Sequence, residues 1–139
     1  NKYKRFDPLY GTPHKFWGYM DYFYVADGFG PNGLIDYYLK AKYKAKDNLT
    51  LSLDAHRFVL PSAVLAADGT SMDKALGTEL DFVANYALTK AVNIEGGYST
   101  MFSTTTLASA KVKNVKNAAD TSSWAYVMIS IKPAEFLVK

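Results

Sequence analysis

The 139-residue sequence has no cysteine, which excludes disulfide bridges, thiolate metal sites and cysteine nucleophiles. It also has no apolar run near the ~20 residues that a transmembrane helix needs. Its formal net charge of +3 is too small to indicate a nucleic-acid-binding protein. The missing helical span leaves membrane insertion open, because the strands of a membrane barrel carry only alternating hydrophobicity.

Features of an enzyme are also scarce. The two histidines, His14 and His56, are far apart and do not have the spacing of metal ligands. No serine lies in the glycine-framed turn of a hydrolase nucleophile, and the glycines form no phosphate-binding motif. We therefore predict no enzymatic activity, no metal and no cofactor. A hydrolase with its site on the rim of an outer-membrane barrel is kept as a minor alternative.

Alternation with a period of two is the main signal that is present. It separates apolar from polar side chains on a strand, whereas a helix would mix them. In the first alternating segment Ile35, Tyr37 and Leu39 share a face, and Lys40, Lys42, Lys44 and Lys46 lie on the other. The five segments are Leu34–Lys46, Leu49–Leu60, Leu76–Leu88, Val92–Phe102 and Ser123–Lys132. A sixth strand around Phe16–Val25 is a weaker expectation.

The lengths of the strands and connections favour a membrane barrel. Thirteen residues at ~3.3 Å span roughly 43 Å, or roughly 33 Å when tilted by ~40°, close to the thickness of a bilayer core. Short connections at Asp47–Asn48 and Thr89–Ala91 alternate with long ones, roughly residues 61–75 and 103–122. Short turns at the periplasmic end and long outer loops are typical of outer-membrane barrels. Matching the apolar faces favours three-residue turns, which would place Lys42 opposite Asp54 and Lys40 opposite His56.

Several stretches resemble a known family. Residues 6–23, FDPLYGTPHKFWGYMDYF, resemble the loop-and-strand signature of alginate-export-type outer-membrane porins of Bacteroidota. GLID at 33–36, LGTELD at 76–81, GYSTMF at 97–102 and WAYVM at 124–128 resemble the closing strands of these porins. The resemblance implies an all-β fold, an antiparallel up-and-down transmembrane β-barrel. It also implies diffusion of small or anionic solutes, in some members polysaccharide, through a charged lumen.

These expectations define the organisation of the chain. Residues 1–139 form the C-terminal portion of a barrel: residues 1–33 a long outer loop, 34–132 five membrane strands, and 133–139 a periplasmic C-terminus. Five or six strands cannot close a pore, so the remaining strands are expected from the same barrel outside this sequence. The other expected partners are outer-membrane lipid and lipopolysaccharide, and an oligomer is compatible with the sequence. We expect no nucleic acid partner.

The polar faces supply the candidate site residues. The expected pore-lining residues are Asp36, Lys40, Lys42, Lys44, Asp54, His56, Glu79, Asp81 and Glu95. With Lys46 and Lys132 they give five positive and five negative charges, which either contact solutes or pair across strands. His14, Lys15 and Asp21 are candidates for a constriction loop, an ordinary packed loop being the alternative. Arg57, on the apolar face near the outer end, is a candidate for lipopolysaccharide contact, and simple snorkelling is the alternative.

The leading alternative is a soluble β-barrel or β-sandwich binding module. It accounts for alternation equally well, because one face of a soluble antiparallel sheet packs on a core. It accounts less well for five long strands together with connections sorted by length. Tyr37, Tyr43, Phe82, Tyr86, Tyr98 and Phe102 are expected to face lipid in the first case and a core in the second.

Overall fold

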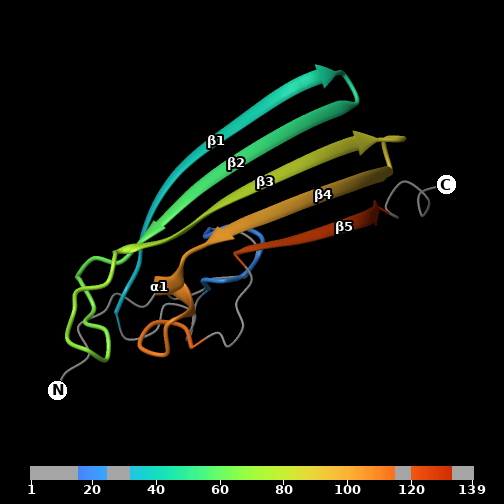
Figure 1. The fold of residues 1–139 in the computed structure, drawn as a ribbon. Helices are drawn as coiled ribbons and strands as arrows, with labels where there is room; N and C mark the ends of the chain where they lie inside the picture. Colours follow the sequence, from blue (N-terminus) through green and yellow to red (C-terminus); the bar gives the residue numbers. More distant parts are fainter. Residues whose placement is uncertain (1–15, 25–31, 115–119, 133–139) are drawn as a thin grey trace.

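The computed structural model describes residues 16–24, 32–114 and 120–132, and its main feature is one antiparallel sheet (Figure 1). The strands are β1 (Ile35–Lys46), β2 (Leu49–Val59), β3 (Ala75–Ala87), β4 (Val92–Ser103) and β5 (Thr121–Ile131). They are hydrogen-bonded in sequence order, so each strand neighbours the next along the chain. The predicted all-β, up-and-down arrangement is confirmed, with strand ends within one or two residues of those expected.

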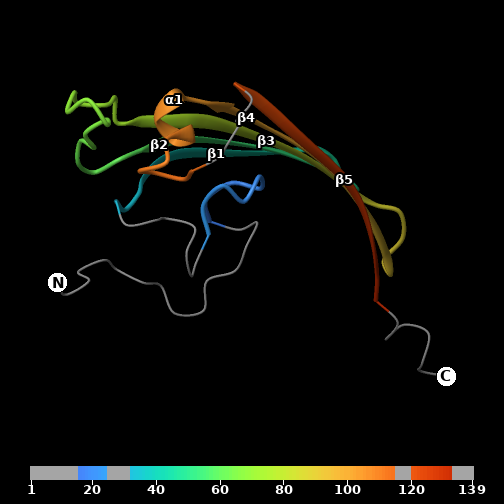
Figure 2. The same ribbon diagram turned by 60° about the horizontal axis from the view of Figure 1, so that its bottom comes forward.

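The sheet is curved and open. Within the described part of the chain, β1 and β5 each have a strand neighbour on one side only. Figure 2 shows the sheet as an arch with residues 16–24 beneath it. We call residues 16–24 the inner segment, the side of the sheet that it covers the polar face, and the opposite side the apolar face.

The two tight turns lie together at one end of the sheet, which we call the turn end (Figure 1). The turn between β3 and β4 has the predicted three residues, Thr89, Lys90 and Ala91. Leu88 N–H donates to the carbonyl of Val92 at 3.0 Å, and the Thr89 hydroxyl accepts the N–H groups of Ala91 and Val92. The threonine thus stabilises the turn by accepting two backbone donors that would otherwise need water.

The turn between β1 and β2 differs from the prediction. It has two residues, Asp47 and Asn48, and the register shifts between Lys44 and Lys46. This irregularity keeps the apolar side chains of both strands on one face, as a three-residue turn would. The alternating pattern was therefore predicted correctly as far as Lys44, but Lys46, which was expected on the polar face, pairs with Leu49 and has apolar-face parity.

The shifted register changes which charged residues face each other. Lys40 lies opposite Asp54, and Lys42 lies opposite Ser52. The predicted pairs of Lys42 with Asp54 and of Lys40 with His56 were wrong by two residues. The hydrophobic pattern repeats every two residues, so it cannot distinguish registers that differ by two.

The described parts of the long connections, residues 60–74, 104–114 and 120, lie at the opposite end, which we call the loop end (Figure 1). There the four-residue helix α1 (Thr105–Ala108) is capped by Thr104, whose side chain accepts the N–H of Leu107. A helix this short does not show the hydrophobic periodicity from which a helix can be predicted. Among the described residues, no helix is long and apolar enough to cross a membrane.

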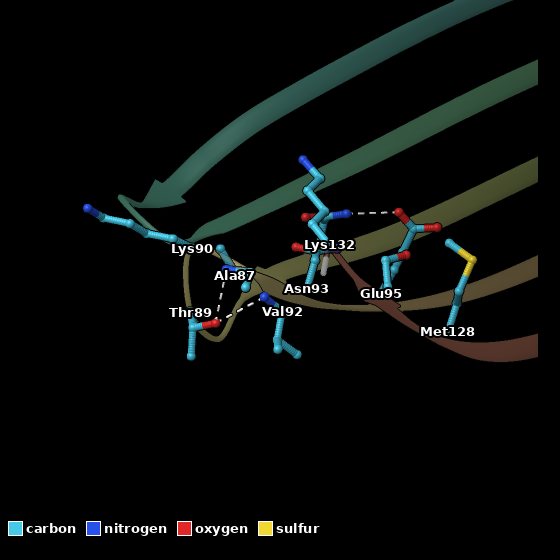
Figure 3. Close-up of a pocket in the computed structure, with 11 residues that line it drawn as sticks. Ala87, Thr89, Lys90, Val92, Asn93, Glu95, Met128 and Lys132 are labelled. Carbon is cyan, nitrogen blue, oxygen red and sulfur yellow. Dashed lines mark hydrogen bonds between the residues drawn. The ribbon is translucent and has the colours of Figure 1, made fainter. Parts of the chain in front are cut away.

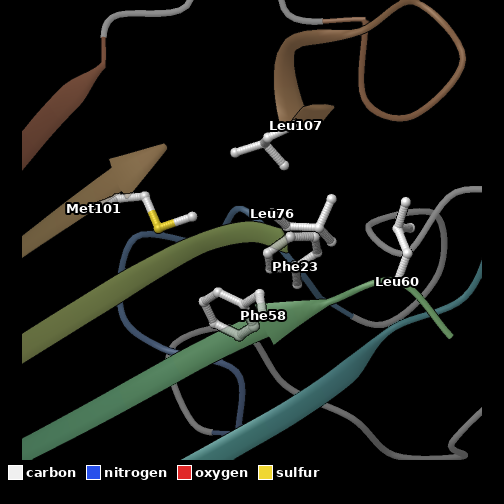
Figure 4. Close-up of a cluster of buried hydrophobic side chains, with 6 residues drawn as sticks. All are labelled: Phe23, Phe58, Leu60, Leu76, Met101 and Leu107. Atoms are coloured by element: carbon white, nitrogen blue, oxygen red, sulfur yellow. The ribbon is translucent and has the colours of Figure 1, made fainter. Parts of the chain in front are cut away.

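A small apolar cluster lies between the loop end of the sheet, α1 and the inner segment. Figure 4 shows its fully buried members, Phe23, Phe58, Leu60, Leu76, Met101 and Leu107. Trp17, Met20, Tyr22, Leu34, Val64 and Val112 pack around them. The cluster joins three segments that are distant in sequence, and it holds the inner segment against the polar face.

Two predictions at this end of the sheet were wrong. Alternation through the segment Leu76–Leu88 predicts Leu76 on the same face as Leu80 and Phe82, but Leu76 is buried in the cluster, because the register of β2 and β3 shifts between Phe58 and Val59. The described part of the suggested sixth strand, residues 16–24, is not a strand. Gly18 and Asp21 have positive φ angles of 81° and 54° there, which extended strand backbone does not allow.

Candidate functional site

The two faces of the sheet have an unusual distribution of polarity. Apolar-face side chains are largely exposed, for example Tyr37 at 63%, Leu39 at 72% and Val127 at 77%. On the polar face, by contrast, Glu79 is 0% and Asp81 2% exposed. Soluble proteins normally bury the apolar set and expose the charged set. The sheet therefore has the reverse of the ordinary arrangement where the polar face is covered, around Glu79 and Asp81.

The exposed apolar surface is continuous across all five strands. The register aligns Ala41, Leu53, Phe82, Tyr98 and Ala125 in one row, and Tyr43, Leu51, Ala84, Gly96 and Val127 in the next. The six aromatic residues predicted for this face, Tyr37, Tyr43, Phe82, Tyr86, Tyr98 and Phe102, are all exposed on it. Scattered exposed apolar residues are ordinary, but contiguous rows of them indicate a surface that contacts something apolar.

Arg57 is the exception on this face. Apart from Lys46 beside the turn, it is the only charged residue of the described strands with apolar-face parity. It lies near the loop end, between Tyr37 on β1 and Thr78 on β3, and its Nη1 donates to Thr78 Oγ1 at 2.9 Å. Its guanidinium is exposed and has further donors beyond the one that this bond uses.

Several charged residues of the polar face pair with each other. Lys40 Nζ lies 2.5 Å from Asp54 Oδ2, directly across β1 and β2. At the turn end, Lys44 Nζ lies 2.8 Å from Asp47 Oδ1, on the surface. These two lysines are thus at least partly neutralised by intramolecular contacts.

The loop-end half of the polar face carries the buried ionisable residues. His56 Nδ1 lies 2.8 Å from Asp36 Oδ2, and its ring stacks 5.6 Å from that of Phe58. Across the strands His56 pairs with Glu79, and Asp81 lies two residues further along β3. The structure thus brings together four predicted pore-lining residues, Asp36, His56, Glu79 and Asp81, in one partly covered group.

The inner segment covers this group through a direct backbone contact. Met20 N–H donates to Glu79 Oε1 at 2.8 Å. Gly18, with its φ of +81°, lies so close to the Glu79 carboxylate that a Cβ atom at this position would overlap it. Only glycine combines this backbone conformation with this close approach, so the position of the Glu79 carboxylate requires glycine at residue 18.

Further contacts attach the inner segment at its other end. Tyr22 OH and Ser122 Oγ, on β5, are hydrogen-bonded at 2.7 Å. The rings of Phe23 and Phe58 are 4.5 Å apart. Of the predicted constriction residues, Asp21 lies in this segment and is half-buried, whereas His14 and Lys15 lie outside the described residues. Sequence reasoning missed Gly18, Met20 and Tyr22, whose contacts are formed by backbone geometry or distant partners.

Beyond the inner segment, a hollow of about 250 Å³ opens on the polar face toward the turn end. It is lined by Tyr19, Lys42, Thr50, Ser52, Val83, Asn85 and Glu95. Glu95 is fixed at its edge, because Oε1 accepts from Tyr126 OH at 2.7 Å and Oε2 accepts from Asn85 Nδ2 at 2.8 Å. Of the predicted pore-lining residues, Lys42 and Glu95 line this hollow.

Tyr19 connects the inner segment to the hollow. Burial, and then the nearby negative charges of Asp54, Glu95 and Asp81, raise the pKa of its hydroxyl above the ordinary tyrosine value. The phenol is therefore neutral near pH 7, and its O–H remains a hydrogen-bond donor. Among the residues that the structure describes, no group of three or more His, Asp or Glu could hold a metal ion.

A second, wider hollow lies at the turn end between β3, β4 and β5 (Figure 3). It has a volume of about 450 Å³ and shares Asn85 and Glu95 with the first. Lys90 and Lys132 lie on its lining. The polar face thus continues from the covered acidic group, through the first hollow, to the turn end.

Comparisons with protein-family models, curated proteins and solved structures found no match to this chain.

Proposed function

We propose that this chain forms part of the wall of a β-barrel channel in a bacterial outer membrane. One observation carries the proposal: a continuous exposed apolar face backed by a charged and partly buried polar face. Lipid is a partner that covers such an apolar face without a second protein, and a water-filled lumen explains charged residues on the concave side. The predicted resemblance to alginate-export-type porins agrees with this reading.

The open edges of the sheet define what else the channel needs. An unpaired strand edge in hydrocarbon leaves N–H and C=O groups without partners, at several kcal/mol for each group. The free edges of β1 and β5 therefore pair, in this proposal, with further strands of the same barrel. The short turns face the periplasm and the long connections face outward, as in known outer-membrane barrels.

The lining residues suggest what passes. Asp36, Lys40, Lys42, Lys44, Asp54, His56, Glu79, Asp81 and Glu95 give the lumen both signs of charge. Small hydrophilic solutes, including anions, would cross by diffusion past the inner segment, which narrows the passage. On the outside, Arg57 near the loop end would contact a phosphate of lipopolysaccharide.

A soluble binding module remains the competing proposal, because the cluster around Phe58 resembles a small core. That cluster, however, covers only the loop end of the polar face. A soluble module would also need a large protein partner to cover the apolar face. In a membrane, lipid covers this face and no such partner is needed. The two proposals predict different effects on stability when a charge is placed on the apolar face.

The test places the same charge on opposite faces at neighbouring positions of β2. Leu53→Arg, near the middle of the apolar face, should reduce the stability of the full-length protein in lipid vesicles by about 2–4 kcal/mol. Ser52→Arg, the matched control on the polar face, should cost much less, since its side chain reaches water. Urea unfolding from vesicles measures both. Equal effects of the two substitutions would contradict lipid contact.

A further inference from the structure

Two charges at the hollow differ from their neighbours because neither has an ionic partner within the part of the chain that the structure describes. Lys40 is paired with Asp54, and Lys44 with Asp47. Lys42 makes no ion pair or hydrogen bond with any residue in the described ranges 16–24, 32–114 and 120–132. Glu95 accepts bonds only from the neutral groups of Tyr126 and Asn85. Among the described residues, the hollow is thus bordered by one positive and one negative charge that have no ionic partner.

The sheet keeps these two charges from neutralising each other. Lys42 lies on β1 and Glu95 on β4, so three strand spacings separate them. At ~4.8 Å a spacing, their backbones are about 14 Å apart across the strands, and the register, which aligns Lys42 with Gly97, adds two residues along β4. Tyr126 and Asn85 also hold the Glu95 carboxylate near its own strand. A salt bridge needs the charged atoms within ~4 Å, so the intervening space is available to a solute.

The remaining lining is polar and suits a small hydrated solute. Thr50 and Ser52 present hydroxyls between the two charges, and Asn85 an amide. Tyr19 of the inner segment contributes an aromatic ring with a neutral hydroxyl from the other side. A volume of about 250 Å³ is below the ~300–1,000 Å³ usual for drug-sized ligands. It holds about eight water molecules at ~30 Å³ each, so it fits only small solutes.

We propose that this hollow is a transit site for small zwitterionic solutes, such as α-amino acids, with Lys42 receiving the carboxylate and Glu95 the ammonium group. The inference rests on the proposed channel function and adds the class of solute to it. A solute that carries both charges pairs with both Lys42 and Glu95, whereas an anion or a cation leaves one of these residues unpaired. Specificity then follows from the difference between these cases.

The experiment uses three probes of nearly equal size: alanine, lactate and alaninamide. Lactate keeps the carboxylate and replaces the ammonium by a hydroxyl, and alaninamide keeps the ammonium and replaces the carboxylate by an amide. The full-length protein is reconstituted in vesicles, and uptake of each labelled probe is measured at low concentration. Alanine should enter about two- to fivefold faster than either analogue, the range that partly exposed ion pairs provide.

Two variants assign the contacts, and a third is the matched control. Lys42→Gln should slow alanine and lactate but leave alaninamide unchanged. Glu95→Gln should slow alanine and alaninamide but leave lactate unchanged. Lys74→Gln makes the same chemical change at an exposed lysine of the connection between β2 and β3, which does not line the hollow, and should alter none of the three rates.

The outcomes separate this inference from the channel proposal. Uptake no faster than in protein-free vesicles, for every probe, would contradict both. Equal uptake of the three probes, or a Lys42→Gln variant that behaves like Lys74→Gln, would leave the channel standing and overturn the zwitterion site. Faster lactate than alanine uptake would instead indicate an anion site at Lys42 alone.

Discussion

The two faces of this sheet invert the usual relation between polarity and exposure. Phe58 on the polar face is 0% exposed, whereas Phe82, on the adjacent strand and the apolar face, is 43% exposed. The charged residues behave oppositely, since Glu79 and Asp81 are buried and Arg57 is exposed on the apolar side. Each face therefore has a cover of different origin: the chain itself covers part of the polar face, and the environment must cover the apolar one.

This difference between the faces shows which part of the sheet is covered by other segments of the same chain. The inner segment, α1 and the long connections all lie toward the polar face or the loop end. None of the described segments outside the sheet packs on the rows that contain Leu53 and Phe82. The chain thus uses its apolar loop residues to cover acidic groups, and no described segment covers its longest apolar rows.

The largest predicted effect compares the two phenylalanines. Phe58→Ala should cost about 3–5 kcal/mol, because the ring leaves a cavity between Phe23 and the rest of the cluster. Phe82→Ala should cost about 1 kcal/mol if the apolar face contacts lipid as proposed, since lipid would fill the space that the ring leaves and only a transfer term would be lost. Urea unfolding of the full-length protein from vesicles measures both values.

The comparison fails if the two substitutions cost the same. A large cost at Phe82 would mean that a packed protein partner, rather than fluid lipid, covers the apolar face. A negligible cost at Phe58 would mean that the cluster at the loop end contributes little to stability. Each result would change the assignment of one face without affecting the other.

The fold was predictable to the extent that it depends on local alternation. The side-chain parity that places Leu53 and Phe82 on one face, and the turn at Thr89–Ala91, follow from residues close in sequence. The pairing of Lys40 with Asp54 depends on the irregularity beside the first turn, which has no mark in composition. That misplaced register also obscured which lysine has no partner.

The covered part of the candidate site depends on contacts between distant residues. The bond from Met20 to Glu79 joins residues 59 positions apart, and no motif indicates it. The sequence analysis placed this segment in a long outer loop with Asp21 as a constriction candidate, but Gly18 was the more specific signal. A glycine among large aromatic residues is consistent with a close approach, although sequence alone cannot name the partner.

The second prediction concerns how firmly the inner segment is held on the polar face. Gly18→Ala places a methyl group against Glu79 and strains a backbone at φ +81°. Gly69→Ala is the matched control, with φ +83° and no atom within 4 Å of the added Cβ, so it isolates backbone strain of about 1–2 kcal/mol. Only the first substitution should displace the segment.

A single cysteine reports that displacement cleanly, because the sequence has none of its own. Met20→Cys should react slowly with an aqueous maleimide, since its backbone is bonded to Glu79 and its side chain borders the cluster. Adding Gly18→Ala should raise the labelling rate about tenfold, equivalent to ~1.4 kcal/mol, and adding Gly69→Ala should not change it. Equal rates in both backgrounds would show that the Glu79 contact does not hold the segment.

The smallest effect is expected at Arg57, the charge that breaks the uniformity of the apolar face. Near an interface a cationic side chain costs only ~0–1 kcal/mol, so Arg57→Gln should change stability by about that amount or less.

The guanidinium of Arg57 has more donors than its bond to Thr78 uses, and these suit the oxygens of a phosphate. Arg57→Gln should therefore reduce the lipopolysaccharide that remains with the full-length protein through detergent purification, measured by native mass spectrometry. Thr78→Val retains the charge but removes the acceptor that orients it, so its loss should be intermediate. Unchanged lipid retention in Arg57→Gln would mean that this arginine only extends to water past the edge of the apolar face.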